Sequence, residues 1–151
     1  MQARTEQFVG LSAVLTGFAR MQLLGTAMAD EYLRAVDAIL PAGVLDELLG
    51  VYQELPAGDG LEAAVAARIL GDPKLGPVAQ NLILLWYCGA WTILPAQWRT
   101  AYGATPGDKT GVVSAAAYQA GLQWMAAGAH AAGSQQQGFG AWSMPPEGSG
   151  L

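Results

Sequence analysis

The chain has 151 residues, of which 52% are hydrophobic and 13% charged, and its formal net charge is −5. This length suits one domain with a buried core of its own. The charged fraction is about half of the ~25% usual in soluble domains. The surface is therefore either built from small uncharged residues or partly covered by another protein.

The charge balance argues against nucleic acid as a partner. Binding to phosphates requires clustered Lys and Arg, whereas only seven basic residues occur, spread singly between Arg4 and Lys109. The single cysteine, Cys88, rules out an internal disulfide and a CxxC site. Because Cys88 falls in an apolar helical segment, its thiol is expected to be inert.

Two helices are predicted in the first 40 residues. The first is predicted to begin at Thr5 and to break at 16–17. Its apolar residues recur at spacings of three and four, which marks one helical face: Phe8, Leu11, Leu15 and Phe18. The second is predicted to end before Pro41, which disfavours helical geometry in the preceding residue. Its apolar face is predicted to contain Leu24, Met28, Tyr32, Val36 and Ile39.

Three further helices follow in the pattern. One covers 45–52 and stops before the turn-rich stretch 56–60. A short one runs through 61–69 to a Gly-Asp-Pro breaker. The fifth begins near Pro77 and reaches Gly89, and it is apolar around most of its circumference, which is typical of a helix at the centre of a bundle. The most apolar stretch of the chain, 78–94, is interrupted by polar residues and is too short to span a membrane comfortably.

The region 92–113 is predicted to be a loop because of its Gly and Pro content, and Ser114 is predicted to cap a sixth helix. No strand alternation persists. We therefore expect an all-α fold, an irregular bundle of about six helices formed by residues 1–133. An extended, Gly/Pro/aromatic carboxyl-terminal arm, residues 134–151, is expected to pack on the bundle or on a partner.

The carboxyl-terminal stretch is the part most suggestive of a partner. After Lys109 only Glu147 is charged. Aromatic residues set among Gly and Pro cannot build a core alone, and Trp is over-represented in interface hot spots. The arm either folds back over its own bundle or lies on a partner, and the missing charge favours the partner. The predicted partner-binding residues are Trp124, His130, Phe139, Trp142, Pro145 and Pro146.

No catalytic, cofactor-binding or metal-binding residue is predicted. The single histidine, His130, has no neighbour to orient it as a base. One His and one Cys cannot supply a zinc tetrad, and neither GxGxxG nor GxxxxGK[ST] occurs. Two alternatives to a partner-binding protein stay open. One is a small stand-alone enzyme or ligand-binding helical protein with an aromatic pocket of Trp86, Tyr87, Trp91 and Trp124. The other is a homo-oligomer with swapped arms.

Three landmarks resemble a known family: 8–17 (FVGLSAVLTG), 85–89 (LWYCG) and the tail 138–142 (GFGAW) before Pro145 and Pro146. In their order along nearly the whole chain they are similar to the small subunits of bacterial FAD-dependent sugar and polyol dehydrogenases. The sorbitol dehydrogenase small-subunit group is the most similar, and the fructose and glucose dehydrogenase small subunits are related to it.

This resemblance implies an oxidoreductase complex in which the small subunit binds no cofactor. A large flavoprotein holds FAD and oxidises the sugar, and a multihaem cytochrome c subunit carries electrons onward. The small subunit is implied to be non-catalytic and chaperone-like, to bind the large subunit and to assist its maturation, stability or export. The implied location is the periplasm, at the inner membrane through the complex.

Two departures from the family pattern stand out. The twin-arginine signal typical of these subunits is missing, because residues 1–7 are polar and lead directly into an amphipathic pattern. Some relatives have a tail cysteine for a covalent link to the large subunit, whereas the tail here has none. A covalent link is therefore not expected.

Overall fold

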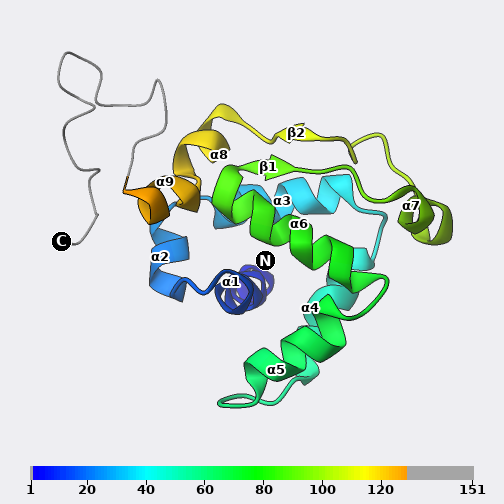
Figure 1. The fold of residues 1–151 in the computed structure, drawn as a ribbon, viewed down its shortest axis with the longest axis horizontal. Coiled ribbons are helices and arrows are strands. Elements are labelled where there is room, and N and C mark those ends of the chain that lie inside the picture. The colour runs from blue at the N-terminus through cyan, green and yellow to red at the C-terminus, as the bar shows by residue number, and fades with distance from the viewer. Residues whose placement is uncertain (1, 129–151) are drawn as a thin grey trace.

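Helix α1 (Gln2–Thr16) lies in the middle of the bundle and packs on the helices that follow it (Figure 1). Phe8 and Leu11 on its inner side are fully buried. Ser12 is also buried, and its hydroxyl donates to the carbonyl oxygen of Phe8 at 2.7 Å, so this polar group stays paired in the core. The predicted break at 16–17 is confirmed, but the start at Thr5 is wrong, because the helix already begins at Gln2.

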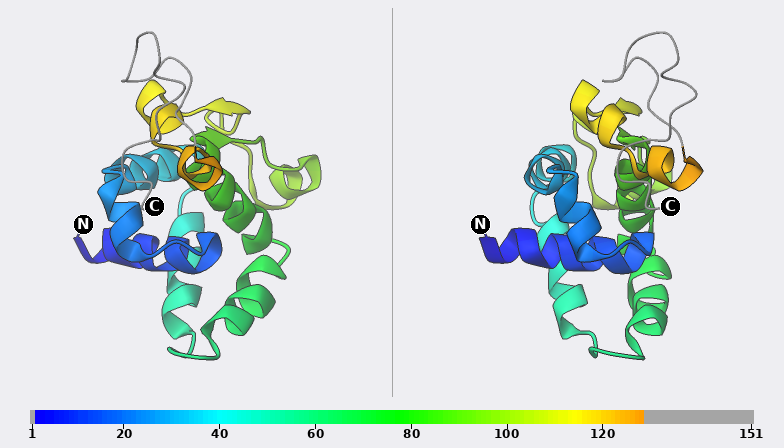
Figure 2. Two further views of the ribbon diagram at one scale, coloured as in Figure 1. Left: turned by 60° about the vertical axis from the view of Figure 1, so that its left-hand side comes forward. Right: turned by 90° about the vertical axis from the view of Figure 1, so that its left-hand side faces the viewer.

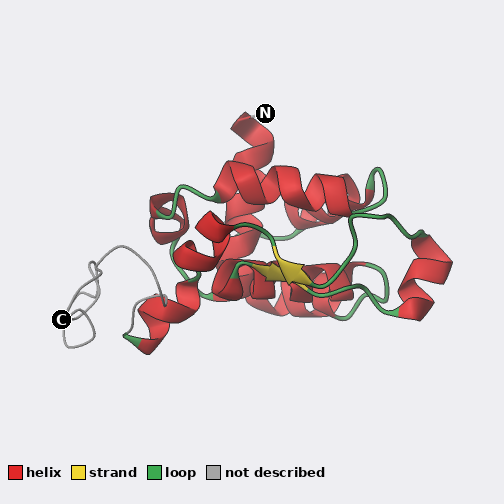
Figure 3. Ribbon diagram, turned by 90° about the horizontal axis from the view of Figure 1, so that it is seen from above, coloured by secondary structure: helices red, strands yellow, loops and turns green. Residues whose placement is uncertain are grey.

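The computed structural model describes residues 2–128 and confirms the all-α fold over that range. After α1 it contains α2 (Arg20–Gly25), α3 (Ala29–Ile39), α4 (Val44–Glu54), α5 (Leu61–Val65), the π-helical turn η1 (Ala66–Leu70), α6 (Leu75–Cys88), α7 (Ala96–Tyr102), α8 (Ala115–Ala120) and α9 (Leu122–Ala127). Two short strands, β1 (Ala90–Trp91) and β2 (Gly111–Val112), pair antiparallel (Figure 3). The arm and the boundary at 133 lie outside the described residues.

Helix α6 is, with α1, one of the two helices around which the core packs. This central position was predicted from the apolar residues around its circumference. The Trp86 ring meets Phe8 of α1 at 6.1 Å and Tyr32 of α3, edge-on, at 4.8 Å. The carboxylate of Asp72 caps its start by accepting the backbone N–H groups of Lys74 and Leu75, at 2.8 and 2.9 Å. Such a cap stabilises a helix by about 1 kcal/mol.

Ion pairs tie the start of α1 to α3 and α4. The Arg4 guanidinium donates to the carboxylates of Asp37 and Asp46, which raises the pKa of Arg4 above its usual value. Lys74 pairs with Glu47 at 2.6 Å. These groups are partly solvated, so each pair adds at most about 1 kcal/mol to the stability.

The second predicted helix is divided into α2 and α3, and one residue of its predicted face is wrongly placed. Thr26 ends α2 because its hydroxyl donates to the carbonyl oxygen of Leu23, at 2.6 Å, and accepts the N–H of Met28. Ala27 then adopts left-handed backbone, with φ 59°. The faces of the two helices are no longer in register, and Leu24 points outward with 54% of its surface exposed.

The region predicted to be a loop, 92–113, contains more structure than expected. It holds α7 and closes the sheet through β2, with Ala90 opposite Val112 and Trp91 opposite Gly111. The buried Trp98 of α7 donates its indole N–H to the backbone oxygen of Lys74 at 2.7 Å. Tertiary contacts such as this one therefore hold a helix of seven residues that has little periodicity of its own.

The sixth predicted helix is capped as expected but interrupted. The Ser114 hydroxyl accepts the N–H of Ala117 at 3.0 Å. At Gly121 the backbone leaves helical geometry, and α9 starts at the next residue. A Cβ atom on Gly121 would lie 2.6 Å from the backbone oxygen of Tyr87, so the break allows close contact with α6.

Candidate functional site

The carboxyl-terminal end of α6 is joined to α8 by backbone contacts. Gly89 ends α6 in left-handed geometry, with φ 67°, and its carbonyl accepts the N–H of Val113 at 2.8 Å. A Cβ on Gly89 would lie 2.4 Å from the backbone carbon and oxygen of Ala117. Only glycine leaves room for the two chains to approach this closely.

The same end of α6 also holds the turn between α1 and α2. The Tyr87 hydroxyl donates to the carbonyl oxygen of Thr16 at 3.0 Å, and Phe18 meets the Tyr87 ring edge-on at 5.7 Å. The Cys88 sulfur lies 3.6 Å from the amide oxygen of Gln123 in α9. Residues next to α2 and residues of α9 are thus fixed to one point of the scaffold.

Trp124, the one predicted partner-binding residue within the described range, lies on this end. Its indole N–H donates to the backbone oxygen of Tyr118 at 2.8 Å, and the two rings meet edge-on at 5.5 Å. The side chain is half-buried against its own chain, so only part of it is left for a partner. His130, Phe139, Trp142, Pro145 and Pro146 lie outside the described residues.

These contacts create a surface with almost no charge, which we call the uncharged end: the exposed residues of 17–27 and 115–128. Arg20 is its single charged side chain. Met21, Leu24 and Met125 are apolar and expose 84%, 54% and 39% of their surface. Figure 1 shows α2, α8 and α9 at the left of the molecule, and Figure 2 (right) looks onto this end.

Only half of this surface could be recognised from the sequence. The absence of charge after Lys109 points to α8 and α9. The contribution of α2 was missed, because the apolar spacing predicted that Leu24 faces the core. The sequence does contain a signal for the α2 half of this surface, because Arg20 is the only charged residue between Glu6 and Asp30.

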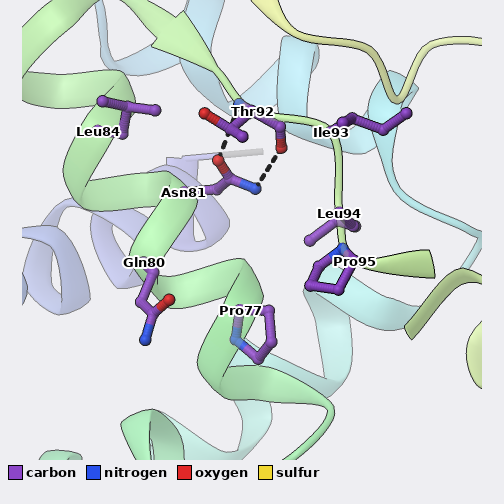
Figure 4. Close-up of a pocket in the computed structure, with 8 residues that line it drawn as sticks. All are labelled: Pro77, Gln80, Asn81, Leu84, Thr92, Ile93, Leu94 and Pro95. Carbon is purple, nitrogen blue, oxygen red and sulfur yellow. Dashed lines mark hydrogen bonds between the residues drawn. The ribbon is translucent and has the colours of Figure 1, made fainter. Parts of the chain in front are cut away.

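A second surface feature is a groove of about 320 Å³ between α6 and the segment after β1 (Figure 4). Its walls are largely apolar, with Pro77 and Leu84 on one side and Ile93 on the other. The Asn81 amide donates to the carbonyl oxygen of Thr92 at 2.8 Å and accepts the N–H of Thr92 at 3.0 Å. This polar group therefore serves the backbone and is not free for a ligand.

The four aromatic residues of the predicted ligand pocket do not line this groove. Trp86 and Trp91 are buried, Tyr87 packs on Phe18, and Trp124 packs on Tyr118. Each of the four rings thus packs against other residues of 2–128. The groove therefore gives no support to the ligand-binding alternative.

A buried carboxylate that sequence reasoning did not single out organises the segment after β1. Asp108 accepts the indole N–H of Trp91 at 2.9 Å and the backbone N–H of Leu94 at 3.1 Å, and its other oxygen lies 3.2 Å from Nε of Arg99. Because all three partners belong to its own chain, Asp108 holds the loop and α7 in place. Burial with a cationic partner is how charged groups are kept inside proteins.

No group of three or more His, Cys, Asp or Glu side chains among residues 2–128 is placed to hold a metal ion. None of the helices of that range is long and apolar enough to cross a membrane.

Comparison of the chain with protein-family models, with curated proteins and with solved structures finds no match.

Proposed function

We propose that the chain is the non-catalytic small subunit of a periplasmic FAD-dependent sugar or polyol dehydrogenase complex. In this role it binds the flavoprotein large subunit and assists its maturation, stability or export. The observation that carries the proposal is the uncharged end, where Met21, Leu24 and Met125 are exposed and Arg20 is the single charge.

The composition of this end is that of a protein interface. The centres of interfaces are depleted of charged residues and enriched in Met and aromatic side chains. Elsewhere on the described surface, exposed carboxylates and basic groups occur on α3, α4 and η1. Most charges of the described chain thus lie outside the uncharged end, which supports binding to another protein there.

The sequence that follows α9 contains aromatic side chains that the proposal assigns to the same contact. Helix α9 ends at the uncharged end, and the chain continues from Gly128 into a sequence with Phe139, Trp142 and one charge, Glu147. Aromatic anchors of this kind contribute most of the binding free energy in many interfaces. In the complex, Phe139 and Trp142 are the anchors that bind the large subunit.

The proposal assigns the cofactors to the other subunits. FAD belongs to the large subunit and haem c to a multihaem cytochrome subunit, and this chain binds neither. It reaches the inner membrane only through the complex, on the periplasmic side. The support for this assignment is the resemblance of the three sequence landmarks to dehydrogenase small subunits.

Co-expression with the flavoprotein encoded beside this chain tests the proposal. We expect the large subunit to be more soluble and to contain more FAD when the chain is present, and the two proteins to purify together. A large subunit that is equally soluble, flavinated and exported without this chain contradicts the proposal.

Variants of the arm locate the contact. Phe139→Ala and Trp142→Ala are each expected to raise the Kd by about 30-fold, which corresponds to a hot-spot loss of about 2 kcal/mol. Ser143→Ala is the matched control, because it changes the same segment without removing an aromatic ring, and its Kd should be unchanged. If all three variants bind equally well, the arm does not hold the partner.

A further inference from the structure

Helix α2 presents its apolar residues to the outside. Met21 and Leu24 are three residues apart, and therefore share a face, and they expose 84% and 54% of their surface. Leu23 is the buried residue of this helix. A surface helix normally turns its apolar face toward the core. Here, an apolar face is left uncovered by residues 2–128.

The outward orientation of this face is fixed by the backbone on both sides of α2. Gly17 before the helix and Ala27 after it adopt left-handed backbone, with φ 79° and 59°. The amide oxygen of Gln22 accepts the N–H of Ala19 at 2.9 Å at the start of the helix. Because both ends are held by local hydrogen bonds and turns, α2 cannot rotate Met21 inward without breaking them.

The chain itself supplies a segment that can cover this face. Helix α9 ends at Ala127, with Gly128 as its cap, on the same end of the molecule as α2 (Figure 1, Figure 2). Another 23 residues follow Gly128 (151 − 128). Ten extended residues already reach about 33 Å. We propose that, in the free protein, residues 129–151 fold back over α2 and that Phe139 and Trp142 cover Met21 and Leu24.

The distribution of charge favours residues 129–151, and not a second copy of the chain, as the segment that covers α2. The only charge on the uncharged end is Arg20, and the only charged side chain among residues 129–151 is Glu147. An isologous dimer would place the same patch against itself. The interface would then contain two Arg20 side chains and no carboxylate from the uncharged end, so nothing in it would balance their charge. The segment after Gly128 brings aromatic rings together with one acidic group.

This inference goes beyond the proposed function and does not depend on it, because it concerns the isolated chain. The two are compatible. In the complex, Phe139 and Trp142 contact the large subunit and no longer cover α2. In the free subunit the contact keeps two aromatic and two aliphatic side chains out of water.

The rate at which hydrogen peroxide oxidises each methionine tests the inference on the full chain. Oxidation to the sulfoxide depends on exposure of the sulfur and is read for each methionine by peptide mass spectrometry. We expect Met21 to be oxidised about tenfold more slowly in the unmodified chain than in the Phe139→Ala/Trp142→Ala variant. A tenfold change corresponds to about 1.4 kcal/mol of docking free energy.

Controls within the same molecule make the result specific. Met28 is buried and should be slow in both proteins, which shows that the fold is intact. Ser143→Ala should leave Met21 protected. Equal, fast oxidation of Met21 in all proteins overturns the inference, since the face is then uncovered in the free chain. Protection that grows with protein concentration overturns it in favour of a second copy.

Discussion

Replacing Gly89 by alanine tests whether backbone contact fixes the uncharged end. Left-handed backbone costs a residue with a Cβ about 1–2 kcal/mol. The new Cβ would also lie 2.4 Å from the backbone of Ala117, where about 3.4 Å is an ordinary contact, so α8 must move. Overpacking of this kind costs about 1–3 kcal/mol. The expected loss is therefore about 2–5 kcal/mol, out of a total stability of about 5–15 kcal/mol.

Gly17→Ala is the matched control. Gly17 has a φ of 79°, and a Cβ there meets nothing within 4 Å, so only the backbone cost of about 1–2 kcal/mol applies. Urea unfolding followed by far-UV circular dichroism measures both variants. Gly89→Asn adds a third comparison, because Asn tolerates left-handed backbone but still adds the Cβ. If Gly89→Ala loses no more stability than Gly17→Ala, α8 does not depend on the close approach.

Two further substitutions test buried polar groups. Asp108→Ala leaves the indole N–H of Trp91 and the N–H of Leu94 without their acceptor. Urea unfolding should therefore show that the free energy of unfolding falls by about 3 kcal/mol or more. A fall of less than about 1 kcal/mol contradicts the role assigned to Asp108. Burial, and secondarily the charge of Glu31, raises the pKa of the Tyr32 phenol above its usual value. The unfolded state then ionises first, so stability should fall as the pH rises above about 10. Tyr32→Phe should reduce this loss of stability at high pH. It should cost no stability at neutral pH, because the Tyr32 hydroxyl is buried without a hydrogen-bond partner in the described structure. A variant with the same pH dependence as the unmodified chain contradicts the assignment to Tyr32.

The helices that the sequence predicted well are those whose ends carry their own signals. Helix α6 is apolar around its circumference and ends at Gly89, and Ser114 caps α8 with its own hydroxyl. Such signals act within a few residues, so they can be recognised without knowing the fold. The end of α1 at Thr16 belongs to the same class.

The features that were missed depend on contacts distant in sequence. Helix α7 is anchored where Trp98 reaches the backbone of Lys74, 24 residues earlier. The burial of Asp108 depends on Arg99 and on the N–H groups of Trp91 and Leu94, which precede it by 17 and 14 residues. The outward face of α2 depends on two left-handed residues, one of them the non-glycine Ala27, which apolar spacing does not reveal.

The uncharged end contains one half that has a local sequence signal and one half that depends on contacts distant in sequence. The stretch after Lys109 could be recognised as charge-free from the sequence, and it accounts for α8 and α9. The other half, α2, lies about 90 residues earlier and is joined to it through Tyr87 and Cys88 at the end of α6. A surface made from two distant segments cannot be assembled from local patterns, although the charge gap around Arg20 marks one half and the gap after Lys109 marks the other.

The two ends of α1 are stabilised in different ways, and the difference bears on the interface that we propose at one of them. Its start is held by the ion pairs of Arg4 with Asp37 and Asp46, which need charged side chains at the surface. Its other end adjoins a region held by backbone contacts at Gly89 and Gly121, which need none. That end is therefore fixed in position and still free of charge. A surface that is already ordered loses less conformational entropy on binding, so the apolar residues exposed there can contribute more of their burial to affinity.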